Sequence, residues 1–336
     1  MQTTIAGYEI TEKLYESTNS LVYRAVCPAN QQSVILKLLN SEYPSPETIA
    51  WFKREYEILR SLDLPGVVKA DALINDQNRW VMVLEDFGGE SLARLMQSRA
   101  IAMDLFFAIA IDLAEILAHV HQRQILHKDI NPANLVFNPT TGQLKLIDFG
   151  IATVLAQENI SLGNPQQLEG TLAYISPEQT GRMNRRVDYR TDLYSLGVTG
   201  YELLTGQLPF SGADALELVH AHIARSPVPL YEVRGGRGDG EMGRWGVQVE
   251  AARLPTSQIP EVLSDIVMKL MAKNAEDRYQ SAYGLKADLE ECYRQWQVAG
   301  EITDFPLAQQ DSCDRFQIPQ KLYGREREIE ELLAAF

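Results

Sequence analysis

The sequence predicts an α+β protein in two parts, a small β-rich part followed by a larger and mainly helical part. Short runs of β-favouring residues alternate with turn residues over positions 1–84, and one helical segment lies between them. From residue 91 onward, helical segments dominate the chain. The length of 336 residues suits about two structural units of this kind.

Composition and charge are typical of a globular protein and narrow the classes of partner. Hydrophobic residues make up 45% and charged residues 23% of the chain, which is ordinary. The net charge of −14 argues against a nucleic-acid partner, because nucleic acid requires a basic face. The most apolar segment, residues 101–120, is interrupted by three acidic residues, so we expect a buried helix there and no membrane span.

The N-terminus and the cysteines indicate a cytoplasmic protein. The first ten residues lack a charged segment followed by an apolar core, so we expect no signal peptide. The three cysteines form no C-x-x-C pair and are typical of scattered, reduced thiols. They are Cys27, Cys292 and Cys313.

In the first part we expect a five-stranded antiparallel sheet and one helix. The helix begins after Ser45, a good N-cap residue that is followed by proline, and runs to about Leu62. Residues 85–89 then form a hinge that contains two glycines. The expected strands are Tyr8–Leu14, Leu21–Val26, Ser33–Leu38, Val67–Ile74 and Arg79–Leu84.

The second part, residues 90–297, should consist mainly of helices. A Gly-rich stretch at 234–258 shows no apolar period, so we expect it to be an exposed, disordered insertion. The expected helices are Ser91–Gln97, Met103–His121, Ala213–Ala224, Glu261–Ala272 and Ser281–Gln297.

The residues that suit chemistry are concentrated in the stretch 126–150. Asp129 and Asn134 lie in a polar loop after an apolar helix, and Asp148 follows a short apolar run that predicts a buried strand. Oxygen ligands that converge on one point suit a hard divalent cation. A further carboxylate beside the cation could accept a proton from an attacking hydroxyl. These are the requirements of phosphoryl transfer.

Two motifs in this stretch resemble those of the eukaryotic-type serine/threonine protein kinases. HKDINPAN is similar to the catalytic loop HRDLKPxN, and IDFG is similar to the metal-binding segment. Either tripeptide core, H-x-D or D-F-G, occurs by chance, but their order and spacing together favour the family. The resemblance covers residues 8–296 and implies a two-lobed protein kinase fold with a small lobe at 1–84, a hinge at 85–89 and a large lobe at 90–297.

The resemblance implies a role for each motif residue in binding ATP and magnesium. Asp129 would be the catalytic base, and Asn134 and Asp148 would bind magnesium. Lys37, at the end of VILK, would contact the α- and β-phosphates of ATP. Glu55 would pair with Lys37. Glu57 is the competing choice, but the spacing of Glu55 from the apolar residues that follow it matches the family register.

The phosphate-binding turn departs most from the family pattern. The family has G-x-G-x-x-G over the ATP phosphates, whereas Tyr15, Ser17 and Ser20 occupy the three glycine positions here. The small serines still let the backbone approach phosphate, with less freedom than glycine. The hinge backbone would hydrogen-bond the adenine. Leu84 would lie at the entrance to the pocket behind it. The nucleotide contacts implied by the resemblance are Leu14, Ser17, Ser20, Val22, Lys37, Leu84, Glu85 and Phe87.

The stretch 150–178 resembles a kinase activation segment and ends in GTLAYISPE. Thr171 matches the family threonine that contacts the catalytic loop, which favours a protein substrate with a serine or threonine acceptor. Glu178 would form a buried ion pair with Arg278. Asp192 would open the central helix of the large lobe and hold the catalytic loop. Thr153 and Ser161 are candidate phosphorylation sites.

Beyond the second part, residues 298–320 have the composition of a polar linker. The following YGRE-x-E, at the start of residues 321–336, resembles the entry to a signalling P-loop ATPase domain, although a plain terminal helix is the alternative. Bacterial hybrids that join a serine/threonine kinase to such an ATPase, and then to sensor and histidine-kinase modules, begin in a similar way. The resemblance therefore implies covalently linked signalling modules in a longer protein.

Three functions are compatible with the sequence, and we expect the first of them. The first is an ATP- and Mg-dependent protein kinase that phosphorylates serine or threonine in signalling. The second is a pseudokinase that acts as a relay module, which the missing glycines favour, as does Asn131 in place of the lysine of HRDLKPxN. The third, a small-molecule phosphotransferase, is disfavoured by GTLAYISPE, which belongs to the protein-substrate branch.

Overall fold

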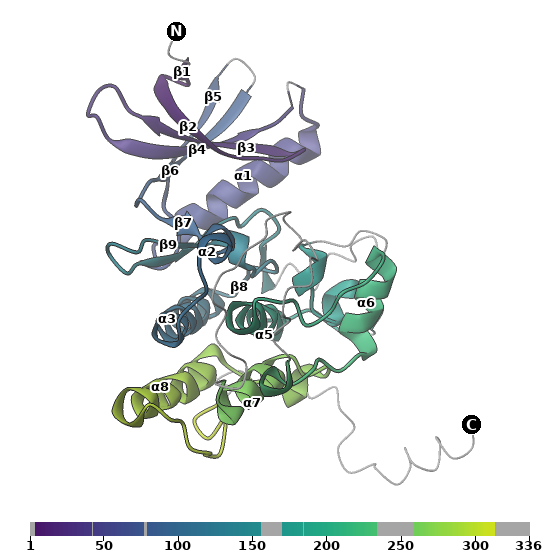
Figure 1. The fold of residues 1–336 in the computed structure, drawn as a ribbon. Helices are drawn as coiled ribbons and strands as arrows, with labels where there is room; N and C mark the ends of the chain where they lie inside the picture. The colour runs from purple at the N-terminus through teal and green to yellow at the C-terminus, as the bar shows by residue number, and fades with distance from the viewer. Residues whose placement is uncertain are drawn as a thin grey trace.

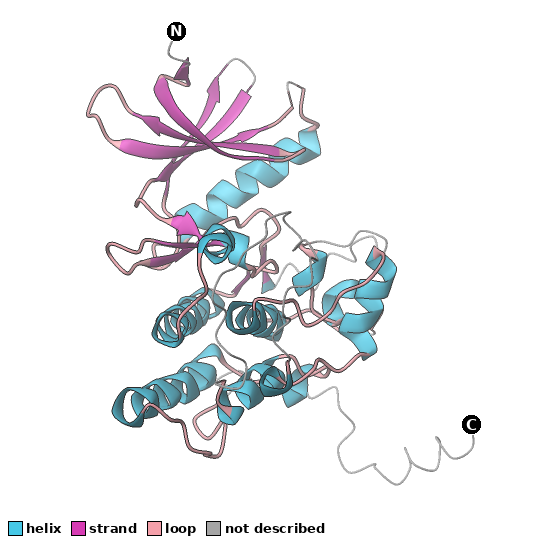
Figure 2. Cartoon of the chain, in the orientation of Figure 1, coloured by secondary structure: helices cyan, strands magenta, loops and turns pink. Residues whose placement is uncertain are grey.

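The structure is a computed structural model that describes residues 4–41, 43–76, 79–155, 170–183, 185–233 and 259–312. Figure 1 shows a β-sheet with one helix against it, joined to a larger helical part below. The same division appears by secondary structure in Figure 2. The predicted two-lobed α+β architecture is therefore confirmed. The expected insertion at 234–258 and the expected ATPase start at 321–336 lie outside the described residues.

The small lobe contains a six-stranded antiparallel sheet rather than the five strands expected. The additional strand is a two-residue edge strand, too short to show a period in the sequence. The strand order is β1-β2-β3-β4-β6-β5. The strands are β1 (Thr4–Ile5), β2 (Tyr8–Glu16), β3 (Ser20–Val26), β4 (Ser33–Leu39), β5 (Ala70–Asp76) and β6 (Arg79–Glu85).

Strand β5 begins three residues later than predicted, because the apolar pair before it has another partner. Val67 forms an isolated parallel bridge with Leu146, and the N–H of Val68 donates to the carbonyl of Leu146 over 3.1 Å. Both valines are buried. They therefore join the small lobe to the large lobe. An apolar run in the sequence does not show whether its residues form a strand or make such a contact.

The alternation of side chains along β4 explains how one lysine reaches the interior of the molecule. Leu36 and Leu38 point to one face and pack in a cluster of apolar residues within the sheet. Lys37 and Leu39 point to the opposite face, towards α1 (Pro46–Ser61). The N-cap Ser45 accepts a hydrogen bond from the N–H of Thr48 over 3.1 Å, which fixes the start of this helix.

The large lobe is built around α3, which packs against α5 and α8 (Figure 1). Its helices are α2 (Leu92–Ser98), α3 (Met103–Gln122), α5 (Arg190–Thr205), α6 (Ala215–Ala224), α7 (Glu261–Leu270) and α8 (Ala282–Ala299). The large lobe also contains two small sheets formed by short strands, which are β7 (Glu90–Ser91), β8 (Ile125–Leu126), β9 (Leu135–Phe137), β10 (Leu144–Leu146) and β11 (Thr153–Val154). Single turns of 3₁₀ helix are η1 (Pro132–Asn134), η2 (Leu172–Tyr174), η3 (Glu178–Thr180), η4 (Leu230–Glu232) and η6 (Ala275–Asp277).

The first part of the expected linker, up to residue 312, is bound to the large lobe. Phe305 and Leu307 pack against the main core. The N–H of Ala308 donates to Asp288 over 2.7 Å. Asp311 accepts a hydrogen bond from the N–H of Gln280 over 2.6 Å. This segment has no regular period, so its packing could not be seen in the sequence.

Among the residues that the structure describes, no helix is both long enough and apolar enough to span a bilayer.

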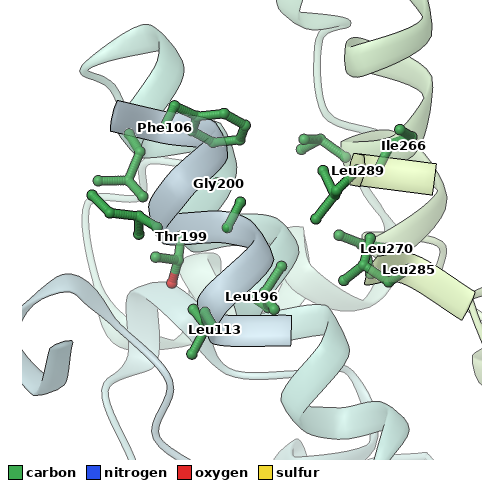
Figure 3. Close-up of a pocket in the computed structure, with 13 residues that line it drawn as sticks. Phe106, Leu113, Leu196, Thr199, Gly200, Ile266, Leu270, Leu285 and Leu289 are labelled. Carbon is green, nitrogen blue, oxygen red and sulfur yellow. The ribbon is translucent and has the colours of Figure 1, made fainter. Parts of the chain in front are cut away.

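Two glycines on α5 allow a matched test of packing. Gly200 lines a small apolar cavity of about 20 Å³ between α3, α5, α7 and α8 (Figure 3), and a Cβ atom there would lie 3.7 Å from Val267, an ordinary contact. A Cβ at Gly197 would lie 2.7 Å from the Cβ of Leu270, which is too close. We expect Gly200→Ala to raise the free energy of unfolding by about 1 kcal/mol, because alanine favours the helix.

Gly197→Ala should instead lower the free energy of unfolding by about 1–3 kcal/mol, because overpacking forces α5 and α7 apart. Thermal denaturation of the two variants measures the difference. Equal shifts in melting temperature would contradict this account of the interface, because helix propensity alone predicts the same gain at both positions.

Candidate active site

The centre of the site is a lysine between two carboxylates from different parts of the chain. The Nζ of Lys37, on β4, lies 2.6 Å from Oε1 of Glu55 on α1 and 2.9 Å from Oδ1 of Asp148, which follows β10. The side chain of Lys37 is 12% exposed. Glu57, the competing partner in the sequence, is exposed to solvent. One strand, one helix and the segment after β10 are thereby held together.

Charge and burial have opposite effects on this group of three residues. Burial opposes the charged form of Lys37, but Asp148 and Glu55 outweigh it and raise the pKa of the ammonium group. Lys37 in turn lowers the pKa of the exposed Asp148, although partial desolvation acts in the other direction. Asp148 is therefore ionised at neutral pH, as a metal ligand must be.

The loop after β8 brings Asp129 and Asn134 together. The Nδ2 of Asn134 donates to Oδ2 of Asp129 and to its carbonyl oxygen, both over 2.9 Å. The N–H of Thr171 donates to Oδ1 of Asp129 over 2.9 Å. These bonds fix the Asp129 carboxylate at the junction of the catalytic loop with the segment expected to bind the protein substrate.

Asn131, the replacement for the family lysine, has a structural role in this loop. Its Oδ1 accepts a hydrogen bond from the N–H of Ala133 over 2.9 Å and so caps η1. Its Nδ2 donates to the carbonyl of Asp129 over 3.1 Å and to the hydroxyl of Thr171 over 3.4 Å. The amide therefore connects the loop to Thr171 without supplying a positive charge.

Asp192, in the first turn of α5, supports the loop from within the core. Its carboxylate accepts hydrogen bonds from the N–H of Lys128 over 2.7 Å and from the N–H of His127 over 3.0 Å. The Nε2 of His121 lies 2.9 Å from the same carboxylate. Burial favours protonation of Asp192, but the hydrogen bond from His121 and those from the backbone outweigh it and lower the pKa.

His127 connects the catalytic loop to the segment that carries Asp148. Its Nε2 donates to the carbonyl of Ile147 over 3.0 Å, and its Nδ1 accepts a hydrogen bond from the N–H of Asp129 over 3.3 Å. The imidazole packs edge-on against the buried Phe149, with ring centroids 4.7 Å apart. His127 thus helps to position Asp129 and the segment that carries Asp148.

The donor set fits a hard divalent cation. The amide nitrogen of Asn134 is engaged with Asp129, which leaves its Oδ1 as an acceptor. The Oδ2 of Asp148 has no hydrogen-bond partner within the described part of the chain. The N–H of Ile147 donates to the carbonyl of Asn134 over 3.0 Å, so the segments that carry Asn134 and Asp148 are adjacent. Oxygen ligands of this kind suit Mg²⁺.

The residues expected to bind the nucleotide border one region of the small lobe. Val22 lies opposite Lys37 in the β3–β4 ladder, and the half-buried Leu14 sits at a bulge in the adjacent β2 strand. Ser17 and Ser20 form the turn between β2 and β3. Leu84 is buried near the end of β6.

The hinge backbone retains a free donor. Glu85, the last residue of β6, directs its carboxylate to Lys145 over 2.5 Å. The carbonyl of Phe87 accepts a hydrogen bond from Nδ2 of Asn138 over 2.5 Å. In the described part of the chain, no group accepts a hydrogen bond from the N–H of Phe87.

One of the two candidate phosphorylation sites in the activation segment is buried. Thr153 is buried, because it pairs with Leu126 in the two-stranded sheet β11–β8. A buried hydroxyl in a strand is inaccessible to a kinase, so Thr153 is unsuitable as a phosphorylation site in this conformation. Ser161 lies outside the described residues.

The expected ion pair at the end of the activation segment is present. Glu178 and Arg278 form a buried ion pair with distances of 2.7 and 2.9 Å.

Three side chains that support the site could not be identified from the sequence. Asn138 holds the hinge carbonyl of Phe87, and Asn40 holds the turn that contains Ser17. Gln179 donates to the carbonyl of Lys128 over 2.8 Å. Asn138 and Asn40 follow strands and look like ordinary turn residues, and their partners are distant in the sequence.

A two-lobed fold with this lysine–glutamate pair and with Asp148 beside the loop that carries Asp129 and Asn134 is typical of a protein kinase. Residues 8–289 match the protein kinase domain family, so the chain belongs to that family. It is 30% identical over 84% of its length to a probable serine/threonine-protein kinase of Clostridium perfringens, covering 38% of that protein. It is 29% identical over 85% of its length to the serine/threonine-protein kinase PrkC of Bacillus subtilis, covering 40%.

A hybrid signal transduction histidine kinase of Dictyostelium discoideum is also similar, with 29% identity over 69% of this chain and 9% of that protein. The chain spans less than half the length of these curated relatives. The family and the relatives identify a serine/threonine-type protein kinase domain.

Proposed function

We propose that the chain transfers the γ-phosphoryl group of ATP to serine or threonine hydroxyls of a protein in signalling, in a magnesium-dependent reaction. The observation that carries this proposal is the contact of Lys37 with both Glu55 and Asp148. It joins the small-lobe sheet and helix to the metal-binding segment, the arrangement that phosphoryl transfer in this family requires. Lys37 would hold the α- and β-phosphates.

The remaining residues take roles that their surroundings support. Asp129, fixed by Asn134 and Thr171, would accept the proton of the attacking hydroxyl. The N–H of Phe87 would bind the adenine, between the apolar side chains of Leu14 and Leu84. Asn134 and Asp148 would hold magnesium, which neutralises charge on the phosphates when it is bound.

A relay module without catalytic activity is the second candidate, and two observations favour it. The turn at Ser17–Ser20 lacks glycine, and Asn131 provides no cation near the transferring group. The metal ligands and the base are nevertheless present, and charge neutralisation is among the largest contributions to such a reaction. We therefore propose a slow kinase rather than an inactive one. In a longer protein, the adjoining ATPase and sensor modules would be its partners.

Incubation of the chain with γ-labelled ATP tests the proposal. With magnesium, we expect label on serine or threonine of the chain itself or of a generic protein substrate, and no label when EDTA removes the metal. Phosphoamino-acid analysis identifies the acceptor. If no magnesium-dependent nucleotide binding and no transfer is found, the kinase proposal fails and the relay module takes its place.

A further inference from the structure

The turn between β2 and β3 is closed by its own hydrogen bonds. The N–H of Ser17 donates to the carbonyl of Ser20 over 2.9 Å. The hydroxyl oxygen of Ser17 accepts hydrogen bonds from the N–H of Ser20 over 3.0 Å and from the N–H of Asn19 over 3.3 Å. Two consecutive backbone donors are therefore occupied by one side chain.

The turn lies next to Lys37, the residue proposed to hold the phosphates, along the β3–β4 pair. Ser20 is in register with Leu39, and Val22 is in register with Lys37, so the turn lies just beyond the lysine along the same pair of strands. Side chains two residues apart on a strand share a face, so Ser20, Val22 and Lys37 face the same region. Consecutive backbone N–H groups in a turn commonly bind anions. Here the hydroxyl oxygen of Ser17, and not an anion, accepts the hydrogen bonds of these N–H groups.

A second contact holds the turn from the neighbouring strand. Asn40 directly follows β4, and its Nδ2 donates to the carbonyl of Ser17 over 2.6 Å. The backbone N–H of Asn40 donates to the carbonyl of Asn19 over 3.0 Å. The turn is thus bonded to β4 at two carbonyls, as well as internally, before any ligand arrives.

We propose that Ser17 and Asn40 form a latch that withholds the backbone N–H groups of this turn from the β- and γ-phosphates of a nucleotide. The triphosphate is then held by Lys37 and the metal-binding side chains, and the turn contributes little to its affinity. Asn40 is a positioning residue in this arrangement, because it acts through the turn and not on the nucleotide. This inference rests on the proposed function, since it concerns how the same site binds ATP.

Ser17→Ala removes the acceptor and frees the N–H groups of Asn19 and Ser20. Calorimetric titration of the full chain with ATP and magnesium should give a dissociation constant about three- to tenfold lower than for the unchanged protein, the range that one or two net hydrogen bonds provide. Adenosine has no phosphates, so its dissociation constant should stay the same. Asn40→Ala should lower the constant for ATP by about two- to threefold, because one backbone bond remains.

Thr18→Ala is the matched control. Thr18 is exposed in the same turn, and its side chain has no hydrogen bond within the described residues, so both constants should be unchanged. Melting temperatures of the three variants establish that each is folded. Amide hydrogen exchange without nucleotide gives an independent readout, because Ser17→Ala should accelerate exchange at Asn19 and Ser20.

The outcomes separate the latch from the proposed function. If adenosine and ATP both bind but Ser17→Ala leaves the affinity for ATP unchanged, the latch is wrong and the kinase proposal is unaffected. A weaker affinity for ATP in Ser17→Ala would also overturn the latch, because it would mean that the hydroxyl contacts the phosphates directly. If the unchanged chain and all variants bind neither compound, the proposed function fails, and the latch fails with it.

Discussion

Asp148→Asn should reduce phosphoryl transfer by at least about a hundredfold, the scale on which a lost electrostatic contact lowers the rate of such reactions. The carboxylate contacts Lys37 over 2.9 Å and is the charged member of the proposed magnesium ligands. An amide keeps the shape of the side chain but removes the negative charge, so magnesium binds less well and Lys37 loses its ion pair with Asp148 while it keeps the one with Glu55. The initial rate of transfer from labelled ATP, measured over a range of magnesium concentrations, gives the effect.

Comparison with Asp129→Asn distinguishes a metal ligand from a base. Asp129→Asn should also lower the rate by about a hundredfold or more, because it removes the proton acceptor, but the affinity for ATP with magnesium should persist. Asp148→Asn should lower both. Asp63→Asn, an exposed aspartate outside the site, is the control and should leave both unchanged. Full activity in Asp148→Asn would show that the metal site is assigned to the wrong residue.

The parts of the site that are visible in the sequence are those encoded within short segments. Asp129 and Asn134 are five residues apart in one loop, and the structure joins their side chains over 2.9 Å. The preference for Glu55 over Glu57 rests on the family register of Glu55 and the apolar residues that follow it, and the structure buries Glu55 and leaves Glu57 exposed. Period and motif are local properties, and the fold class follows from them.

Other features depend on contacts between distant segments, and the sequence carries no local signal for them. Strand β11 contains only two residues, so its pairing with β8 and the burial of Thr153 leave no period to detect. The carbonyl that Asn138 binds lies 51 residues away, and the one that Asn40 binds lies 23 residues away. Any exposed asparagine after a strand would look the same. The prediction that Val67 belongs to the strand that ends at Ile74 is wrong for a related reason, since an apolar run does not specify its partner.

The second large effect is expected at the ion pair that joins the activation segment to the large lobe. The side chain of Arg278 is 0% exposed, and its Nη atoms donate to both carboxylate oxygens of Glu178 over 2.7 and 2.9 Å. Its remaining donors bind the carbonyls of Arg190, Ala272 and Lys273 over 2.8 to 3.2 Å. All five N–H groups of the guanidinium thus have an acceptor. No other side chain supplies five donors, so a substitution of Arg278 leaves some of these acceptors without a partner.

We expect Arg278→Met to lower the free energy of unfolding by about 3–5 kcal/mol, because it leaves the buried carboxylate of Glu178 without its counter-charge. Thermal or denaturant unfolding at neutral pH measures the loss. Arg294→Met is the matched control, because Arg294 pairs with Glu291 at the surface with 63% of its side chain exposed. An exposed pair contributes little, so the unfolding midpoint of this variant should stay close to that of the unchanged protein.

If the charge on Glu178 causes the loss of stability in Arg278→Met, that loss should depend on pH. Burial favours protonation of Glu178, but Arg278 outweighs it and holds the pKa of the carboxyl below its ordinary value of 4.5. The stabilisation by the pair is therefore fully present above pH 4.5 and decreases as the pH falls through the folded-state pKa. The difference in stability between the unchanged protein and Arg278→Met should begin to narrow above pH 4.5, because burial without Arg278 raises the pKa of Glu178 in the variant and a protonated Glu178 needs no counter-charge. A difference that stays constant from pH 7 to pH 4 would mean that lost packing and carbonyl contacts, and not the unpaired carboxylate, account for the destabilisation.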